Sequence, residues 1–355
     1  MMKVPESNYR FFVEAMQNKK PARMPIYEHK IDDIFIENAT GIPMRQLAAG
    51  SVADQKLYYK HLVDFWQNCG YDTVSFSMGI PKALPGSGAL RFNSAPCITD
   101  PDDMEAYPWD KLEDWYFEKF GPTYEMFTEE VMKRDGIRAV GGPGNGIFEI
   151  VQDLVGYMEL CYLRVDEPEM VDEMFARVTD LFLRIWKRFL KTYADAYCVC
   201  RVGDDLGFLS NTLLPHDEIR KWILPGYKAL VDMVHESGRP FLLHSCGQIF
   251  DIMEDILATG IDAKHSNEDS IAPFSRWVEL YGERICNIGG IDMNILCQGT
   301  PEYIKERTRQ VIEESIDHGG FILGCGNSIP DYVPVEGFFA MLEVANEYRI
   351  KQYGK

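Results

Sequence analysis

Short apolar segments and longer amphipathic segments alternate along the chain. Eight short segments are rich in β-branched and aromatic side chains and are followed by glycine or polar residues, the pattern of buried strands. They are residues 23–29, 71–77, 137–143, 196–202, 240–247, 262–268, 284–292 and 320–326. The segments between them have helical periodicity. One begins at Pro301 and ends before Gly319, and proline at the start with glycine after the end is typical of a helix.

Eight alternations of strand and helix predict a parallel sheet, and eight parallel strands close a (β/α)8 barrel. An open, doubly wound α/β sheet is the alternative. The glycine-rich phosphate loop that usually follows the first strand of such a sheet is missing, because Glu28-His29-Lys30-Ile31 contains no glycine. We therefore predict a single (β/α)8 TIM barrel domain over residues 1–355.

One connecting stretch, residues 81–136, is too long for a single helix. It follows the second predicted strand and contains an acidic run at 100–103 and an aromatic-rich helical pattern over 109–127. We predict that this stretch is an insertion after strand 2 that covers part of the barrel mouth like a cap. A separate domain is not expected, because no linker divides the chain.

Charge and composition exclude several classes of protein. The chain has 36 Lys and Arg against 55 Asp and Glu, a net charge of −19, whereas a nucleic-acid binder needs clustered cations. No stretch approaches the ~20 apolar residues of a membrane span, and the first residues lack the apolar run of a signal peptide. Nine cysteines without an export signal argue against a disulfide framework. We expect a cytoplasmic protein with free thiols and with neither a nucleic acid nor a membrane as a partner.

A candidate metal site lies at the carboxyl ends of the predicted strands, where barrel enzymes place their active sites. His244 and Cys246 are two residues apart in one strand and so face the same side. Cys325 ends the last predicted strand, across the same mouth. Imidazole and thiolate suit zinc, and catalytic zinc sites keep three protein ligands and one open position. Each residue alone could be a small buried core residue, but the three together at strand ends favour a metal site.

The other cysteines are less well placed to bind a metal. Cys286 is a rival third ligand, but it starts its strand and is expected away from the mouth. Cys198 and Cys200 share one strand face and precede the end of that strand, so we expect them to pack in the core.

Acidic residues near the strand ends are candidates for catalysis. Asp204 and Asp205 follow the fourth predicted strand, where a carboxylate can orient or bind zinc, bind substrate, or simply cap a helix. Glu268, after the sixth strand, is a third candidate catalytic residue, and His265 beside it is a candidate for lining the pocket. Glu149 follows a glycine-rich loop and either faces the mouth or favours the positive end of its helix.

At these residues the sequence resembles the uroporphyrinogen decarboxylase superfamily, over nearly the whole chain. The likeness is carried by Pro21-Ala22-Arg23-Met24-Pro25-Ile26, Gly203-Asp204-Asp205-Leu206-Gly207, His244-Ser245-Cys246-Gly247, Gly289-Gly290-Ile291-Asp292 and the closing glycine-rich strand before Ile329-Pro330. The resemblance implies the (β/α)8 barrel independently of the strand count.

Within the superfamily the sequence looks more like one branch than the other. The decarboxylases need no metal and carry an arginine-rich segment after the first strand, which grips the carboxylates of their substrate. Here that place reads Tyr27-Glu28-His29-Lys30-Ile31-Asp32-Asp33, without arginine, which predicts a poor site for a polyanion. The corrinoid-dependent methyltransferases have a His-x-Cys zinc motif followed much later by Cys in the last strand. This resemblance implies that His244, Cys246 and Cys325 are the zinc ligands.

The resemblance implies a zinc-dependent methyltransferase whose partner is a corrinoid protein. The methyl group would move between the cobalamin of that protein and a small methylated substrate or thiol. An aryl methyl ether, as in an O-demethylase, methanol, a methylamine and a methyl thioether all stay open, as does the direction of transfer. Two alternatives are a metal-free decarboxylase or lyase on the same barrel, and a non-catalytic barrel that only docks a corrinoid protein.

Overall fold

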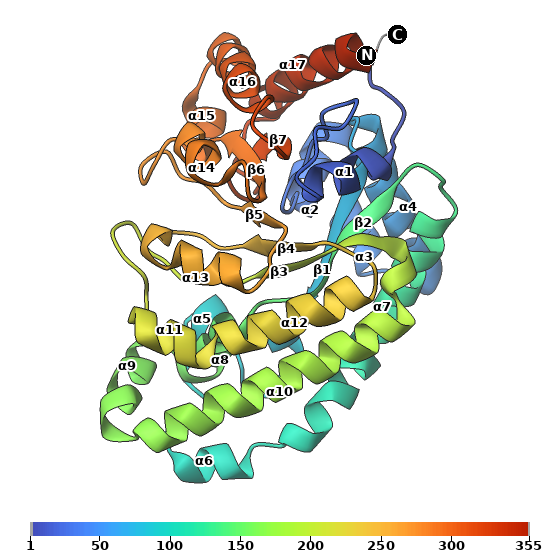
Figure 1. The fold of residues 1–355 in the computed structure, drawn as a ribbon. Helices are drawn as coiled ribbons and strands as arrows, with labels where there is room; N and C mark the ends of the chain where they lie inside the picture. Colours follow the sequence, from blue (N-terminus) through green and yellow to red (C-terminus); the bar gives the residue numbers. More distant parts are fainter. Residues whose placement is uncertain (1–2, 354–355) are drawn as a thin grey trace.

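The computed structural model describes residues 3–353 and contains a parallel sheet of seven strands that neighbour one another in sequence order (Figure 1). The strands are β1 (Thr73–Gly79), β2 (Arg138–Gly144), β3 (Tyr197–Gly203), β4 (Phe241–His244), β5 (Ala263–His265), β6 (Cys286–Ile291) and β7 (Phe321–Cys325). Each overlaps one of the predicted strands. The predicted domain, 1–355, extends beyond the described residues at both ends.

The first predicted strand, residues 23–29, is an extended segment that forms no regular strand. Ile26 bridges Leu323 of β7, and on the other side the Ser75 hydroxyl of β1 donates to a backbone carbonyl of the segment at 2.6 Å. Pro25 has no N–H to donate, which limits the ladder of hydrogen bonds here. The sheet within residues 3–353 therefore has seven strands where eight were predicted, and residues 23–29 lie between its two edge strands.

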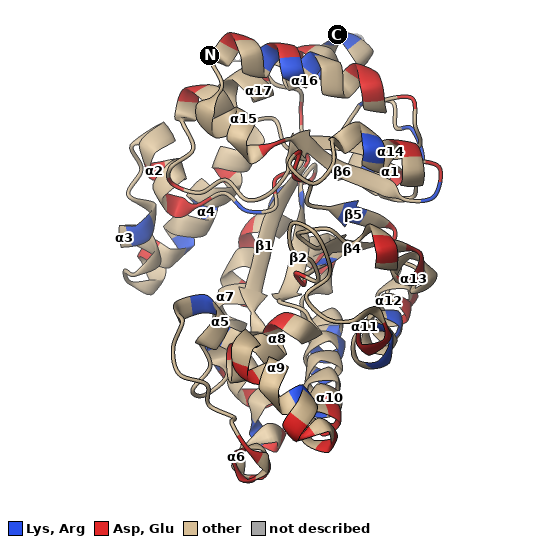
Figure 2. Cartoon of the chain, turned by 90° about the vertical axis from the view of Figure 1, so that its left-hand side faces the viewer, with Lys and Arg blue, Asp and Glu red and all other residues tan. Residues whose placement is uncertain are grey.

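Helices surround the strands in both views (Figures 1 and 2). They are α1 (Tyr9–Met16), α2 (Asp33–Thr40), α3 (Met44–Ala48), α4 (Val52–Asn68), α5 (Ala89–Phe92), α6 (Pro101–Ala106), α7 (Leu112–Met132), α8 (Ile147–Val155), α9 (Tyr157–Asp166), α10 (Pro168–Thr192), α11 (His216–Trp222), α12 (Leu224–Glu236), α13 (Met253–Ala258), α14 (Phe274–Tyr281), α15 (Met293–Gln298), α16 (Pro301–Ser315) and α17 (Val335–Tyr353). Four 3₁₀ turns are η1 (Ile80–Ala83), η2 (Trp109–Lys111), η3 (Ala194–Ala196) and η4 (Phe250–Ile252). None of the helices in residues 3–353 combines the length and the apolar character needed to cross a membrane.

One crossover helix forms where the sequence pattern predicted it, and a second one also buries an apolar face. The predicted helix at Pro301 is α16, with proline in its first turn and the Thr300 side chain accepting from the backbone N–H of Tyr303. α10 buries apolar residues spaced three or four apart, from Met170 to Phe189, which gives it one face toward the sheet. Charged residues colour the outer helices in Figure 2, α16 and α17 among them.

The stretch 81–136 contains two different parts. Its second part, α7, is the crossover helix between β1 and β2, and its Phe127 stacks on Phe76 of β1 with ring centroids 3.8 Å apart. Its first part, with η1 and α5, brings Lys82 and Arg91 to the cavity described below. The role of this stretch as a cap stays a prediction.

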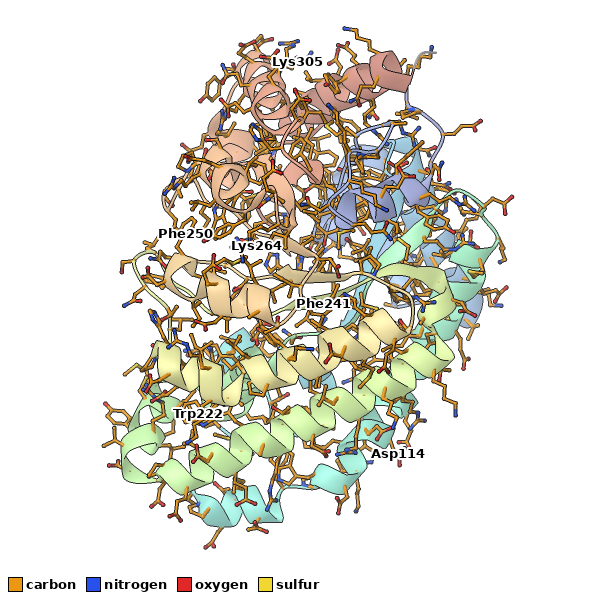
Figure 3. The ribbon with its side chains drawn as sticks, in the orientation of Figure 1. Asp114, Trp222, Phe241, Phe250, Lys264 and Lys305 are labelled. Atoms are coloured by element: carbon orange, nitrogen blue, oxygen red, sulfur yellow. The ribbon has the colours of Figure 1, made fainter. Side chains whose placement is uncertain are left out.

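The β4–β5 side of the sheet separates an inner and an outer layer of side chains. Neighbouring residues of a strand face opposite sides, so His265 of β5 faces the inner side of the sheet while Lys264 faces the helices. Lys264 is buried, its ammonium lies 3.7 Å from the centre of the Trp277 ring, and burial lowers its pKa to about 7. Trp277 in turn stacks on Phe250, which Figure 3 labels beside Lys264.

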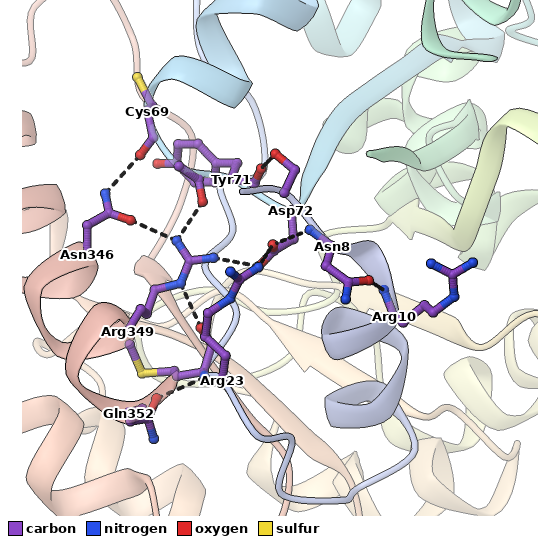
Figure 4. Close-up of polar contacts among 12 residues, drawn as sticks. Asn8, Arg10, Arg23, Cys69, Tyr71, Asp72, Asn346, Arg349 and Gln352 are labelled. Carbon is purple, nitrogen blue, oxygen red and sulfur yellow. Dashed lines mark hydrogen bonds and ion pairs between the residues drawn. The ribbon is translucent and has the colours of Figure 1, made fainter. Parts of the chain in front are cut away.

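A buried ion-pair network joins the two ends of the chain at the amino ends of the strands (Figure 4). The Asp72 carboxylate, just before β1, pairs with Arg23 and with Arg349 of α17, both at 2.6 Å. Arg349 also donates to the carbonyls of Met24 and Gly70. All three charged side chains are buried. The network therefore fastens the last helix to the first segment and to β1.

Candidate active site

Side chains from several strands meet at the carboxyl ends of the sheet. The register pairs Gly203 of β3 with His244 of β4, and His244 with His265 of β5. Cys325 ends β7. Because the sheet is parallel, these residues lie at the same end of the molecule, which is where the sequence placed them.

His244, Cys246 and Asp205 form a compact group of possible metal ligands. Nε2 of His244 lies 3.5 Å from Sγ of Cys246 and 4.0 Å from Oδ1 of Asp205. Oδ1 of Asp205 also accepts from the backbone N–H of Cys246 at 2.9 Å. The three ligand atoms lie within 4.8 Å of one another, close enough to bind one ion, and imidazole, thiol and carboxylate are all zinc ligands.

Cys325, the third predicted ligand, faces a different partner. Sγ of this fully buried residue lies within hydrogen-bond distance of the Glu28 carboxylate and 2.6 Å from the backbone carbonyl oxygen of Asn327, and its single S–H can donate to one of them at a time. The Asn327 amide donates to Sγ of Cys246 at 3.4 Å, so Asn327 connects the two cysteines. Glu28 was missed as a site residue, although an acidic residue ending an apolar run is a detectable signal. Burial raises the pKa of Glu28 to about 8.

His29, His244 and His265 form a second group whose ligand atoms lie within 4.8 Å. The His29 and His244 rings stack with centroids 3.7 Å apart, and the buried Nδ1 of His29 has no hydrogen-bond partner among the described residues. Desolvation lowers the pKa of all three imidazoles, that of His265 to about 3. Neutral imidazole is the form that binds metals. His265 was a predicted candidate for lining the pocket, whereas no role was predicted for His29.

Asp204 binds the start of a helix that is distant in sequence. It is fully buried, and its carboxylate accepts from the backbone N–H groups of Phe148 and Glu149 in the first turn of α8 and from the Tyr227 hydroxyl. Burial raises its pKa to about 7. This arrangement corresponds to the capping alternative weighed for the aspartates, and a catalytic role for Asp204 stays a prediction.

A cavity of about 580 Å³ opens beside His244 and is lined by Asp205 and Glu149. Glu149 accepts from the Asn145 amide at 2.6 Å, and burial together with the neighbouring aspartates raises its pKa well above the ordinary value. The raised pKa favours the protonated form, in which a carboxylic acid can donate a hydrogen bond. Glu268, the third predicted catalytic residue, lines a separate cavity of about 460 Å³.

Arg201 of β3 brings a buried positive charge to the 580 Å³ cavity. Its guanidinium donates only to neutral groups, namely Tyr27 Oη, His29 O, Ser75 Oγ and Ser77 Oγ. Within residues 3–353, no carboxylate forms an ion pair with it. A buried cation without a carboxylate partner is costly, so the cavity is suited to an anionic ligand.

Further cations line the same cavity. The segment after the first predicted strand has no arginine, which predicted a poor site for a polyanion, and this stays a prediction. Lys82, Arg91 and Arg45 line the cavity together with Arg201, but Arg45 pairs with Glu37 and Arg91 pairs with the buried Asp153. These cations come from other parts of the chain, so inspection of one loop could not reveal them.

Three other cysteines, Cys198, Cys200 and Cys286, lie away from the mouth, as predicted. Cys198 and Cys200 are buried in the two apolar clusters of the core, and Cys286 is buried at the start of β6. Burial raises the thiol pKa of each, which fits a packing role.

Comparison with known proteins identifies the family. Residues 61–348 match the family model described as uroporphyrinogen decarboxylase (URO-D). A methylated-thiol–coenzyme M methyltransferase of Methanosarcina mazei is 24% identical over 264 residues, which cover 73% of this chain and 66% of that protein's length. The solved structure of a methyltransferase from Methanosarcina mazei has a TM-score of 0.75 at 14% identity, covers 97% of this chain and 99% of that one, and shows the shared fold. The chain belongs to the uroporphyrinogen decarboxylase (URO-D) family.

Proposed function

We propose that this protein is a zinc-dependent methyltransferase. The methyl group moves between a small methylated substrate, or a thiol, and the corrinoid of a partner protein. The observation that carries the proposal is the group of imidazole, thiol and carboxylate within 4.8 Å at the carboxyl ends of the strands. The methyltransferase names of the two Methanosarcina mazei relatives support it. In this proposal residues 23–29 complete a (β/α)8 barrel, and the stretch 81–136 narrows its mouth.

The chain offers a suitable set of zinc ligands. His244 and Cys246 would hold the ion, with Asp205 and Cys325 as further ligands, and the thiol of Cys325 would then exchange Glu28 for the metal. Zinc, when bound, supplies a Lewis acid that keeps a substrate sulfur as thiolate or stabilises a departing heteroatom. The corrinoid, carried by the partner protein, supplies the cobalt that exchanges the methyl group.

The cavity residues select and orient the substrate. Arg201 is held by four neutral acceptors and faces the cavity with an unneutralised charge, so we propose that the substrate carries an anionic group such as a carboxylate. Glu149 in its protonated form donates a hydrogen bond, and Asp205 lies between the cavity and the metal ligands. Methanol and methylamines have no anion for Arg201, which favours a thiol or an aryl methyl ether that also bears an anionic group.

A second candidate function is decarboxylation of a polyanionic substrate without metal. The observation that favours it is the pair of cations Lys82 and Arg201 in the cavity, to which Arg91, paired with Asp153, adds a third. A metal-free decarboxylase would give His244 and Cys246 no role in the reaction. The third reading, a barrel that only docks a corrinoid protein, predicts binding without turnover.

The test follows the spectrum of free cobalamin, because Co(I) and methyl-Co(III) forms absorb differently. We expect the purified protein to hold zinc and to exchange methyl groups with cobalamin in the presence of an anionic thiol or methyl ether. Zinc removal should stop the change and zinc return should restore it. Cys246→Ala should be inactive, whereas the matched variant Cys198→Ala, at a buried cysteine away from the mouth, should behave as wild type. Decarboxylation of uroporphyrinogen by the metal-free protein, with no methyl exchange on any substrate, would refute the proposal.

A further inference from the structure

A chain of hydrogen bonds crosses the barrel interior between two of the predicted metal ligands. Nε2 of His265 lies 3.0 Å from the backbone carbonyl oxygen of Cys325, and Nδ1 of His265 lies 2.7 Å from Nδ1 of His244. On its other side, Nε2 of His244 faces Sγ of Cys246 and Oδ1 of Asp205. These contacts connect strand β7 through β5 to the candidate metal centre.

The donors and acceptors of this chain determine where the protons are. A carbonyl oxygen can only accept, so Nε2 of His265 carries a proton and donates to Cys325 O. A neutral imidazole has one N–H, so Nδ1 of His265 has the lone pair. Nδ1 of His244 must then donate to it. His244 is left with a lone pair on Nε2, the atom that faces Cys246 and Asp205.

The surroundings keep both rings neutral and oriented. His244 and His265 are buried, and burial disfavours imidazolium. Tyr27 packs edge-on against the His265 ring with centroids 5.3 Å apart, and His29 lies parallel to it at 5.6 Å. The ring of His265 therefore cannot turn to offer its nitrogens to other partners without disturbing these contacts.

We propose that His265 is a positioning residue that fixes the tautomer of His244 and so presents the Nε2 lone pair to the metal. The inference rests on the proposed metal site and goes beyond it, because it assigns to His265 a role through another residue. Residues that hydrogen-bond to the free nitrogen of a metal-binding histidine typically change metal affinity 10–100-fold when removed. The carbonyl at the end of the chain belongs to Cys325, so the backbone of one ligand strand helps to orient the ligand of another.

One rival arrangement makes His265 a direct ligand, in the group His29, His244 and His265. A metal held there would need lone pairs on both His244 and His265 toward the same ion. His265 would then need a lone pair for the ion, so its imidazole would be a metal ligand rather than a hydrogen-bond partner of His244. The two arrangements therefore predict different ligand sets, and removing the imidazole of His265 costs the metal a nitrogen ligand in only one of them.

The first experiment is nitrogen NMR of the metal-free protein with ¹⁵N-labelled histidine. We expect a protonated Nδ1 and an unprotonated Nε2 on His244, with the reverse on His265. His265→Phe should leave His244 in a mixture of tautomers. His265→Asn, whose side-chain oxygen can take the place of Nδ1 as acceptor, should keep the tautomer of His244. This readout needs neither metal nor turnover, so it distinguishes failure of this inference from failure of the proposed function.

The second experiment measures affinity for zinc against a chelator, and the absorption of the Co(II)-substituted protein. His265→Phe should bind zinc about 10–100-fold more weakly, with the Co(II) ligand set unchanged. His265→Asn should recover most of the affinity. The control His235→Phe, at an exposed histidine, should match wild type. Loss of a nitrogen ligand in the Co(II) spectrum would make His265 a ligand and overturn the inference. An unchanged tautomer and affinity in folded His265→Phe would overturn it too. If that variant does not fold, the wild-type tautomers and His265→Asn still decide the question.

Discussion

Replacing Arg349 with Met should weaken the fold strongly without touching the mouth. Methionine keeps most of the unbranched stem and removes the guanidinium. Arg349 is fully buried and donates to Asp72 at 2.6 Å, to Met24 O at 2.9 Å, to Gly70 O at 2.5 Å and to Asn346 Oδ1 at 2.8 Å. All four acceptors lose this donor in the variant.

The expected loss of stability depends on the partners that Asp72 and the backbone carbonyls keep in the variant. Breaking a buried ion pair costs about 3–5 kcal/mol, and Asp72 keeps Arg23 and the backbone N–H of Asn8, which argues for about 3 kcal/mol. Two backbone carbonyls left without this donor add about 1 kcal/mol. The free energy of unfolding should therefore fall by about 4 kcal/mol, and with a urea m-value of about 3 kcal/mol/M the midpoint should fall by about 1.3 M.

Urea unfolding followed by circular dichroism measures this change. The control is Arg284→Met, which removes a surface ion pair with Glu254 whose side chains are 48% and 69% exposed. Water screens an exposed ion pair, so the control should leave the midpoint nearly unchanged. The urea midpoint of Asp72→Asn should lie below that of Arg349→Met, because Arg23 and Arg349 then both lose the charge of the Asp72 carboxylate. Equal midpoints for Arg349→Met and the control would refute the reasoning.

Three further predictions concern the mouth. Metal analysis should find about one zinc per wild-type chain and loss of it in Cys246→Ala and Cys325→Ala; full occupancy in Cys325→Ala would remove that residue from the site. Asp205→Asn should lower turnover and leave the free energy of unfolding nearly unchanged. Asp204→Asn should lower the free energy of unfolding by about 1–3 kcal/mol, because it weakens hydrogen bonds to the start of α8. A larger loss of stability in Asp205→Asn than in Asp204→Asn, measured by urea titration, would contradict this assignment. Burial raises the thiol pKa of Cys246 and Cys325, so both are protonated without metal at neutral pH, and zinc binding should release about two protons and strengthen as pH rises. Calorimetry in buffers of different ionisation enthalpy counts these protons, and a release of none would exclude thiolate ligation.

Local patterns predicted the strands and part of the site. The rule that residues two apart in a strand share a face placed His244 with Cys246, and their separation of 3.5 Å agrees with it. Asp205 directly follows a predicted strand, so the sequence also predicted its place at the carboxyl ends of the strands. The first predicted strand is only partly formed, because Pro25 lacks a donor for the ladder.

Contacts between distant segments could not be predicted in this way. Arg201 and Glu28 interrupt apolar strand patterns, and only the assembled sheet shows which cavity or partner they face. Asp204 was recognisable as a capping residue, but the helix that it caps starts more than fifty residues earlier in the chain. The thiol of Cys325 faces Glu28 because residues 23–29 lie beside β7, a neighbour relation between the two ends of the chain.

The ion pair between Asp72 and Arg349 also has a consequence for how the protein is made. The two residues are 277 positions apart, and at a synthesis rate of about 5–20 residues per second Asp72 precedes Arg349 on the ribosome by roughly 14–55 s. During that time Arg23 is the ion-pair partner that the new chain can already offer to Asp72. The attachment of the start of β1 to the last helix becomes possible only after α17 has been translated, so it is among the last native contacts that the chain can form.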